Sequence, residues 1–478
     1  MKECVDGTRR PFSQAVLRCV RPERSGGDYV TKQSRFVWIS ALLVLLATTL
    51  IWFVFGRDNS VQASASSRAE EDSESWQTSA QESSAGSPDG SGPEFSGKSE
   101  TTDTVSEFTS AAGKEYQPLT FSTVRAVWIS YIDFQELTMG ADETVFREKF
   151  TEVIGNCSSL GVNTLYLHVR PFADAMYPSE LFPWSKYASG RQGVDPGYDP
   201  LGIVLELAHA EGVAVHAWIN PFRISRDPES YLCPENIGLV WQEKDQGLVR
   251  EVDGGLYFNP ACPEVVSLVA DGVDELCRKY DLDGIHFDDY FYPTTDESFD
   301  ADQYASYTLS GGKKSLDDWR RENVDTLVAR VHEVCSGYDV PFGISPAGNL
   351  DYCYFTQYAN IARWMNEPGY VDYIVPQIYW GFEHASKPFE ETLESWQSIC
   401  SPDVPLICGL AAYKAGTEDG NTEWLDSHDV LARQTESCTR HNTAGWALYR
   451  YGSLFNPVSS AADAAAEELE ALRERLME

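Results

Sequence analysis

Two adjacent carboxylates end a strongly β-prone run in the segment from Asp283 to Tyr290, whose sequence is DGIHFDDY. Side chains alternate between the two faces of a strand, so Asp288 and Asp289 are expected to meet different surroundings. Different surroundings allow one carboxylate to stay ionised while the other keeps a proton near neutral pH. Such a pair can cleave glycosidic bonds if a barrel surrounds it. The simpler alternative is that the two aspartates only cap the next loop.

These carboxylates need a scaffold, and the chain after residue 123 alternates short apolar runs with helical patterns. Eight runs qualify as strands: Arg125 to Tyr131, Val162 to Arg170, Val213 to Asn220, Gly284 to Asp288, Pro341 to Pro346, Tyr373 to Tyr379, Pro405 to Ala411 and Gly445 to Tyr449. Helical patterns include 144–160, 200–211, 263–280, 315–336 and 461–477. Eight such units predict an α/β fold, a (β/α)8 TIM barrel. A doubly wound sheet is disfavoured because no glycine-rich phosphate-binding turn follows the first strand.

In such a barrel the carboxyl ends of the strands build the active site, and here these ends carry amides, aromatics and charges. Sugars suit this lining because their rings present apolar faces to aromatic side chains, while their hydroxyls need donors and acceptors. We therefore expect substrate contacts from His168, Arg170, Asp174, Asn220, Tyr290, Gln377, Tyr379 and Trp380.

The expected catalytic residues are Asp288 and Asp289. Asp288 is the expected nucleophile or base. The expected acid is Asp289 or a loop carboxylate such as Asp174, Glu180 or Glu383. Asp289 qualifies only if the chain bends after Asp288, because strand alternation otherwise directs it to the other face.

Three histidines, His168, His216 and His286, are expected to point into the barrel, where His and carboxylate side chains could together bind zinc. They lie at different distances from their strand ends, which favours neutral histidines that are hydrogen-bonded to neighbours. We therefore expect no metal and no other cofactor. Arg170 shares a strand face with His168 and is expected to lower the pKa of a facing carboxylate.

The N-terminal part of the chain differs in composition from the rest. Residues 36–55 form an uncharged apolar run, long enough to cross a bilayer and longer than a secretory h-region, which favours a retained signal anchor. Basic residues precede this run and only Arg57 follows it closely, so residues 1–35 are expected in the cytoplasm and the rest outside the cell membrane. Residues 56–118, rich in Ser and Glu, are expected to be a disordered linker to a barrel over residues 119–478.

The charge and the cysteine spacing exclude some classes of partner and site. The formal net charge of −36 disfavours nucleic acid, because an acidic surface repels phosphate backbones. The eleven cysteines include no CxxC pair, which speaks against a zinc ribbon or a redox motif. The expected partners are a polysaccharide and, through residues 36–55, the lipid bilayer.

Nine motifs, in chain order, resemble the glycosyl hydrolase-like 10 family. They are RAVWIS (125–130), VNTLYLHVRPFADAMYPSELFPWS (162–185), DPGYDPL (195–201), VHAWINPFRI (215–224), DGIHFDDYFYP (283–293), DWRRENV (318–324), FGISPAG (342–348), VDYIVPQIYW (371–380) and GLAAYK (409–414). The resemblance implies a TIM-barrel glycosidase of the bacterial envelope, similar to a divisome-localised enzyme that cleaves peptidoglycan glycan strands. It also implies cell-division or envelope proteins as partners. Tyr290 stands where chitinase-type barrels carry their acid Glu, which speaks against substrate-assisted hydrolysis of that kind.

These observations predict a membrane-anchored, extracytoplasmic glycoside hydrolase that acts on a polysaccharide, above all on peptidoglycan glycan strands. Two alternatives remain open: a non-catalytic glycan-binding barrel and a metal-dependent polysaccharide deacetylase. The three differ in product. A hydrolase releases reducing ends, a binding protein releases nothing, and a deacetylase releases acetate and stops with a chelator.

Overall fold

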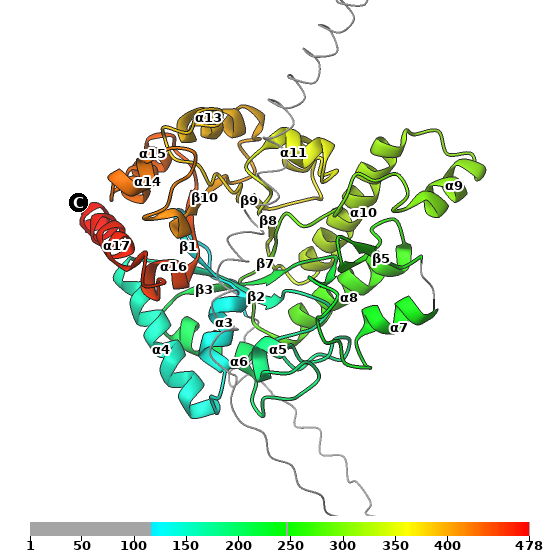
Figure 1. The fold of residues 1–478 in the computed structure, drawn as a ribbon, viewed down its shortest axis with the longest axis horizontal. Helices are drawn as coiled ribbons and strands as arrows, with labels where there is room; N and C mark the ends of the chain where they lie inside the picture. The colour runs from blue at the N-terminus through cyan, green and yellow to red at the C-terminus, as the bar shows by residue number, and fades with distance from the viewer. Residues whose placement is uncertain (1–115, 245–246, 478) are drawn as a thin grey trace, which may run out of the picture. The chain divides into compact units, whose positions relative to one another are not determined.

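Eight parallel strands form the central sheet of the computed structural model, which describes residues 116–244 and 247–477 (Figure 1). In spatial order the strands are β10 (Ile407–Ala411), β11 (Gly445–Tyr449), β1 (Val124–Ile129), β2 (Thr164–Arg170), β3 (Ala214–Ile219), β7 (Gly284–Phe287), β8 (Phe342–Ile344) and β9 (Tyr373–Ile374). Parallel bridges from Ile374 to Leu406 and from Gln377 to Gly409 bring the β9 edge to the β10 edge. The sheet therefore curls into a nearly closed barrel, and the predicted TIM-barrel fold is confirmed.

Each predicted strand is present, and β8 and β9 are much shorter than expected. β2 is buried along its whole length, as expected of a parallel strand covered on both faces. β9 ends at Ile374, well before Tyr379, because Pro376 has no N–H to donate to a ladder. The chain beyond it still meets its neighbours at the Gln377 bridges.

Helices surround the barrel (Figure 1). They are α3 (Tyr131–Thr138), α4 (Glu143–Ser159), α5 (Lys186–Ser189), α6 (Pro200–Ala210), α7 (Ile237–Lys244), α8 (Pro263–Lys279), α9 (Ala301–Leu309), α10 (Leu316–Ser336), α11 (Leu350–Phe355), α12 (Ile361–Asn366), α13 (Phe389–Ile399), α14 (Glu423–Asp426), α15 (Val430–Arg440), α16 (Tyr451–Phe455) and α17 (Ala462–Met477). α8 shows why they pack, because Val265, Leu268, Val269 and Leu276 recur at helical spacing and are all buried. The five helices predicted from periodicity are α4, α6, α8, α10 and α17.

A second, antiparallel sheet between β3 and α8 was not predicted. It has the order β4 (Arg223–Ser225), β6 (Gly255–Phe258) and β5 (Val249–Val252). β5 and β6 form a hairpin whose turn residues, Asp253 and Gly254, both have positive φ angles of 51° and 84°. An Asp-Gly pair between two short apolar runs is a hairpin signal that the sequence did contain. β4 begins at Arg223, which follows the carboxyl end of β3.

The inside of the barrel contains a chain of hydrogen-bonded rings. The Trp128 indole donates to His286 Nε2 at 3.2 Å, and His286 Nδ1 lies 3.2 Å from the Tyr373 hydroxyl. That hydroxyl also lies 2.7 Å from His216 Nδ1. Burial lowers the pKa of His216 to about 4 and holds that of His286 well below its usual value, so both are neutral. Two of the three histidines therefore have the expected hydrogen-bonded role.

Asp283, the first residue of the DGIHFDDY segment, holds the start of the described chain. Its Oδ1 accepts from the Tyr116 hydroxyl at 2.5 Å and from the Leu119 N–H at 2.7 Å, and its Oδ2 accepts from the Val215 N–H at 2.7 Å. Residues 116–118 were expected in the linker, but Tyr116 already contacts the barrel. Between Tyr116 and Met477, apart from residues 245–246, no helix is long and apolar enough to cross a bilayer. The expected span, residues 36–55, and the linker up to residue 115 lie outside the described residues.

Candidate active site

Asp288 lies one residue beyond β7 and is buried, with 3% of its surface exposed. Its Oδ2 accepts from Trp218 Nε1 at 3.0 Å and, more weakly, from Asn220 Nδ2 at 3.4 Å. Both donors come from the end of β3, which pairs directly with β7. Its other oxygen, Oδ1, lies 3.4 Å from the Tyr290 N–H. The carboxylate is thus fixed against the β3 side of the barrel.

The pKa of Asp288 is raised to about 7. Burial is the main cause, because it disfavours the charged form, and the negative charge of Asp289 adds to it. The positive charge of Arg223 and the bond from Trp218 oppose the rise. Asp288 can therefore hold a proton near neutral pH, which is the property of a general acid.

Asp289 is half-buried and is fixed on the other side. Its Oδ1 accepts from Gln377 Nε2 at 3.1 Å and its Oδ2 accepts from Gln357 Nε2 at 3.2 Å. Gln357 also donates to the Asp289 main-chain carbonyl. Two amide donors stabilise an ionised carboxylate. Because β7 ends at Phe287, strand alternation no longer governs Asp289, and the bend that we required after Asp288 is present.

Arg223, at the start of β4, provides the cation that lowers the pKa of Asp288. Its guanidinium lies 4.4 Å from the Tyr290 ring centroid and 4.7 Å from that of Phe172, and the residue is only 4% exposed. Arg170 was expected to lower the pKa of a facing carboxylate, and its charge does oppose the rise in the pKa of Asp174. A register irregularity in β2 pairs Arg170 with Ile219, and its guanidinium lies over Phe182 at 4.7 Å.

Buried polar atoms without hydrogen-bond partners gather at the end of β2. They are both ring nitrogens of His168, Nε and Nη2 of Arg170, and Oδ1 of Asp174. His168 stacks on Trp218, with 3.6 Å between centroids and 12° between planes, so it adjoins the donor that holds Asp288. Buried polar groups normally have partners, so this stretch has capacity to bind the hydroxyls of a ligand.

The three loop carboxylates that we considered as the acid differ in exposure. Asp174 is buried, its Oδ2 accepts from Gln192 Nε2 at 2.9 Å, and burial raises its pKa to about 6. Glu180, by contrast, is 70% exposed and pairs with Lys279 at 3.3 Å. Glu383 is exposed, and its main-chain N–H donates to Glu423 at 2.9 Å. Only Asp174 shares the buried environment of Asp288.

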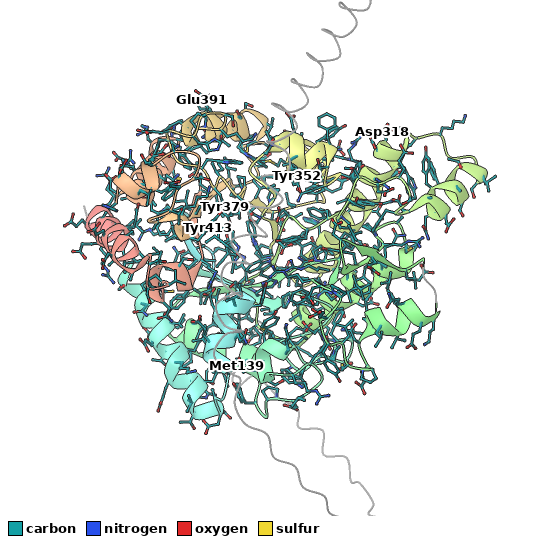
Figure 2. All side chains as sticks on the ribbon, viewed as in Figure 1. Met139, Asp318, Tyr352, Tyr379, Glu391 and Tyr413 are labelled. Atoms are coloured by element: carbon teal, nitrogen blue, oxygen red, sulfur yellow. The ribbon has the colours of Figure 1, made fainter. Side chains whose placement is uncertain are left out.

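Aromatic side chains line the opposite part of the strand ends. Tyr379 stacks on Tyr449 with 5.7 Å between centroids, and Tyr413 meets Tyr379 edge-on at 5.8 Å (Figure 2). Burial is the main cause of the raised pKa of Tyr379, and the negative charges of Asp289 and Asp288 add to it. Trp380 is 7% exposed and its ring packs beside Gly348, where an added Cβ would lie 2.6 Å away. Trp380 therefore serves packing in this structure.

The family model for glycosyl hydrolase-like 10 matches residues 123–426, which is more than half of the chain and includes every site residue that we predicted from the sequence. The chain belongs to the glycosyl hydrolase-like 10 family. The resemblance noted from the motifs is thereby confirmed.

Two curated relatives of this glycosyl hydrolase-like 10 protein have similar identity. Glycosyl hydrolase YngK of Bacillus subtilis is 32% identical over 338 residues, which cover 65% of this chain and 65% of YngK. Glycosyl hydrolase DigH of Escherichia coli K12 is 33% identical over 297 residues, which cover 57% of this chain and 67% of DigH. The match to YngK thus spans less than two thirds of that relative's length.

Among solved structures, the glycoside hydrolase domain of PgaB (BpsB) from Bordetella bronchiseptica is similar, with a TM-score of 0.50 and 13% identity. The similarity covers 74% of this chain and 99% of that domain. At this identity it shows the fold alone. The similarity agrees with the barrel fold of this chain.

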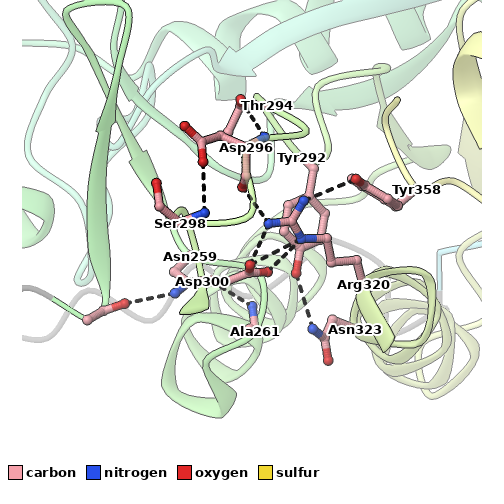
Figure 3. Close-up of polar contacts among 11 residues, drawn as sticks. Asn259, Ala261, Tyr292, Thr294, Asp296, Ser298, Asp300, Arg320, Asn323 and Tyr358 are labelled. Carbon is pink, nitrogen blue, oxygen red and sulfur yellow. Dashed lines mark hydrogen bonds and ion pairs between the residues drawn. The ribbon is translucent and has the colours of Figure 1, made fainter. Parts of the chain in front are cut away.

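A buried ion pair fixes the loop that follows the two catalytic candidates (Figure 3). Arg320 of α10 donates from Nε to both oxygens of Asp300, at 3.1 and 3.0 Å, and neither residue is exposed. Arg320 also donates to the Asp296 carbonyl at 2.7 Å and to the Tyr358 hydroxyl at 3.0 Å. Tyr358 follows Gln357, so this network connects the loop after β7 to the segment that holds Asp289.

Sequence reasoning missed three parts of the site in this glycosyl hydrolase-like 10 chain: Arg223, Gln357 and the Arg320 network. Gln357 lies 68 residues from Asp289 in sequence and follows no predicted strand. Arg223 was visible in the motif VHAWINPFRI, three residues after Asn220. Within the described ranges no group of three or more His, Cys, Asp or Glu side chains is placed to hold a metal ion.

Proposed function

We propose that this chain is a glycoside hydrolase in which Asp288 and Asp289 carry out the cleavage. The observation that carries the proposal is the difference between two neighbouring carboxylates. Asp288 is buried with a pKa of about 7, whereas Asp289 is held by two amide donors that favour its ionised form. One proton donor beside one ionised carboxylate is the minimum that glycoside cleavage requires.

The two environments favour roles opposite to those expected from the sequence. Asp288, with the raised pKa, is the general acid that protonates the leaving oxygen of the glycosidic bond. Asp289 is the ionised partner that acts as base or nucleophile. The fixed glutamines keep its charge at one position, as preorganised electrostatics requires.

The remaining polar groups suit sugar hydroxyls. His168, Arg170 and Asp174 supply buried atoms without partners, and Asn220 and Gln377 supply amides beside the carboxylates. Aromatic faces are provided by Tyr290, which stacks on Arg223, and by Tyr379. This mixture of apolar faces and convergent polar groups fits a carbohydrate better than a purely apolar ligand.

We propose peptidoglycan glycan strands as the substrate. Residues 36–55 would anchor the chain in the cell membrane, residues 1–35 would lie in the cytoplasm and the barrel would lie outside, where that polymer is found. The support comes from the apolar run, from the basic residues before it and from the motif resemblance. Cell-division or envelope proteins are the partners that this location would offer.

The test uses the purified full-length protein with intact, peptide-stripped and deacetylated glycan strands, with products read by mass spectrometry. We expect new reducing ends, and we expect Asp288→Asn to lower kcat at least about 100-fold because the proton donor is lost. The matched control is Asp281→Asn, at an exposed aspartate two residues before the DGIHFDDY segment, and this variant should keep full activity.

Other products would contradict the proposal. Glycan binding without any cleavage would indicate a binding barrel. Release of acetate that stops with a chelator would indicate a deacetylase. Full activity of Asp288→Asn would remove Asp288 from the mechanism.

A further inference from the structure

α11 carries an aromatic side chain that no part of the proposed catalytic machinery uses. Phe355 is 61% exposed and its neighbour Tyr354 is 37% exposed. Their rings meet edge-on, with 5.0 Å between centroids and 84° between planes. Single exposed apolar residues such as Leu309, at 88%, are ordinary on protein surfaces, so position must decide whether Phe355 has a function.

The position of Phe355 is set by its helix. α11 follows β8 at the catalytic end of the barrel, and Tyr352 precedes Phe355 by three residues. Residues at this spacing lie on the same side of a helix, with about 5 to 6 Å between their Cβ atoms. The Tyr352 carbonyl accepts from the Gln357 N–H at 3.1 Å, and the Gln357 amide donates to Asp289 at 3.2 Å, so this part of α11 adjoins that carboxylate. Burial raises the pKa of Tyr352 to about 12, and the charge of Asp289 adds to it. Phe355 therefore lies on the same side of α11 as Tyr352, one helical turn further along.

The segment is also held rigidly. The Arg321 guanidinium lies 4.1 Å from the Tyr354 ring centroid, and Arg321 Nη1 donates to the Tyr354 carbonyl at 3.2 Å. Two residues beyond Phe355, Gln357 is bonded to Asp289 at 3.2 Å. An exposed aromatic ring on such a fixed support loses little conformational freedom when a ligand stacks on it.

We propose that Phe355, with Tyr354 beside it, forms a further sugar-binding subsite that stacks on a ring of the glycan chain beyond the sugars bound at Asp288 and Asp289. This inference rests on the proposed function. The aromatic ring packs against the apolar face that a sugar ring presents. The subsite contributes to binding only when the chain is long enough to reach α11.

The experiment measures binding of the full-length protein to peptide-stripped glycan strands that are separated into short and long fractions. The Asp288→Asn background prevents cleavage during the measurement. In that background we expect Phe355→Ala to weaken binding of long strands about five- to tenfold, the value of one aromatic stacking contact. Binding of short strands should not change. Phe355→Trp should restore long-strand binding, and Leu309→Ala on α9 is the exposed apolar control.

Several results would overturn the subsite: unchanged long-strand binding in Phe355→Ala, an equal loss for short and long strands, an equal loss in Leu309→Ala, or no glycan binding at all. The proposed function fails in a different way. If the protein with an intact Asp288 cleaves nothing, but Phe355→Ala still loses only long-strand binding, the subsite stands and hydrolysis does not.

Discussion

The buried ion pair between Arg320 and Asp300 should dominate the stability of the loop that follows Asp288 and Asp289, the two carboxylates proposed to be catalytic. Both side chains are fully buried, and Arg320 donates to Asp300, to Tyr358 and to the Asp296 carbonyl. Arg320→Met keeps most of the volume but leaves the Asp300 carboxylate buried without its cation. Removal of one partner of a buried pair costs about 3 to 5 kcal/mol of the free energy of unfolding.

Urea denaturation at pH 7 measures this loss, and α10 contains its own control. Arg330 pairs with Glu333 on the surface of the same helix, with side chains 49% and 70% exposed, so Arg330→Met should cost less than about 1 kcal/mol. The double variant Arg320→Met/Asp300→Leu should lose less than the sum of the two single variants, because it leaves no unpaired buried charge.

Two outcomes would refute this reasoning. If Arg320→Met costs no more than Arg330→Met, the pair is not the desolvated contact that its burial indicates. If the double variant loses the full sum, the two residues do not act on one another. Either result would also remove the basis for connecting Tyr358, and through it Gln357, to the loop after β7.

Two further predictions concern Asp288. Arg223→Met removes the cation that lowers the pKa of Asp288, so this pKa should rise. In a pH profile of kcat/KM, the alkaline limb should move about one pH unit or more above its position near pH 7. An unmoved limb would exclude Arg223 from this role. The second prediction concerns the pH dependence of stability. The charge of Asp288 should lower the free energy of unfolding of the wild type as pH rises, and Asp288→Asn should remove this effect. The folded pKa of Asp288 is raised from 3.8 to about 7, so its contribution to stability is fully present below pH 3.8 and is lost as pH rises through about 7. The Asn variant lacks this loss. At pH 8 its free energy of unfolding, measured with urea, should exceed that of the wild type by on the order of 1 to 4 kcal/mol, with no difference near pH 4. Equal urea midpoints at pH 8 would show that the charge of Asp288 does not destabilise the folded protein.

The barrel could be predicted because parallel strands that are covered on both faces appear in the sequence as short, continuous apolar runs. β2 and β10 are apolar or buried at every position, and each is separated from the next strand by a helix with buried residues at helical spacing. The small antiparallel sheet has a weaker pattern in the sequence. β4 has only three residues, too few for a pattern with a period of two to be recognised.

The site was harder to predict because its geometry depends on departures from regular structure. Alternation along β2 placed Arg170 on the face of His168, but the register shifts between these two residues, and Arg223 on β4 is the cation that lowers the pKa of Asp288. Alternation along β7 separated Asp288 from Asp289, but the strand ends before both. Gln357 could not be found from spacing at all, because tertiary structure alone brings it to Asp289.

The order of strands explains how two neighbouring aspartates acquire different chemistry. β7 lies between β3 and β8 in the sheet. Asp288 receives its donors, Trp218 and Asn220, from the β3 side, whereas Asp289 receives Gln357 and Gln377 from the segments that follow β8 and β9. Burial keeps a proton on Asp288, while the two amide donors favour charge on Asp289. The asymmetry that the proposed acid-base cleavage needs therefore agrees with the position of β7 between two unlike neighbours.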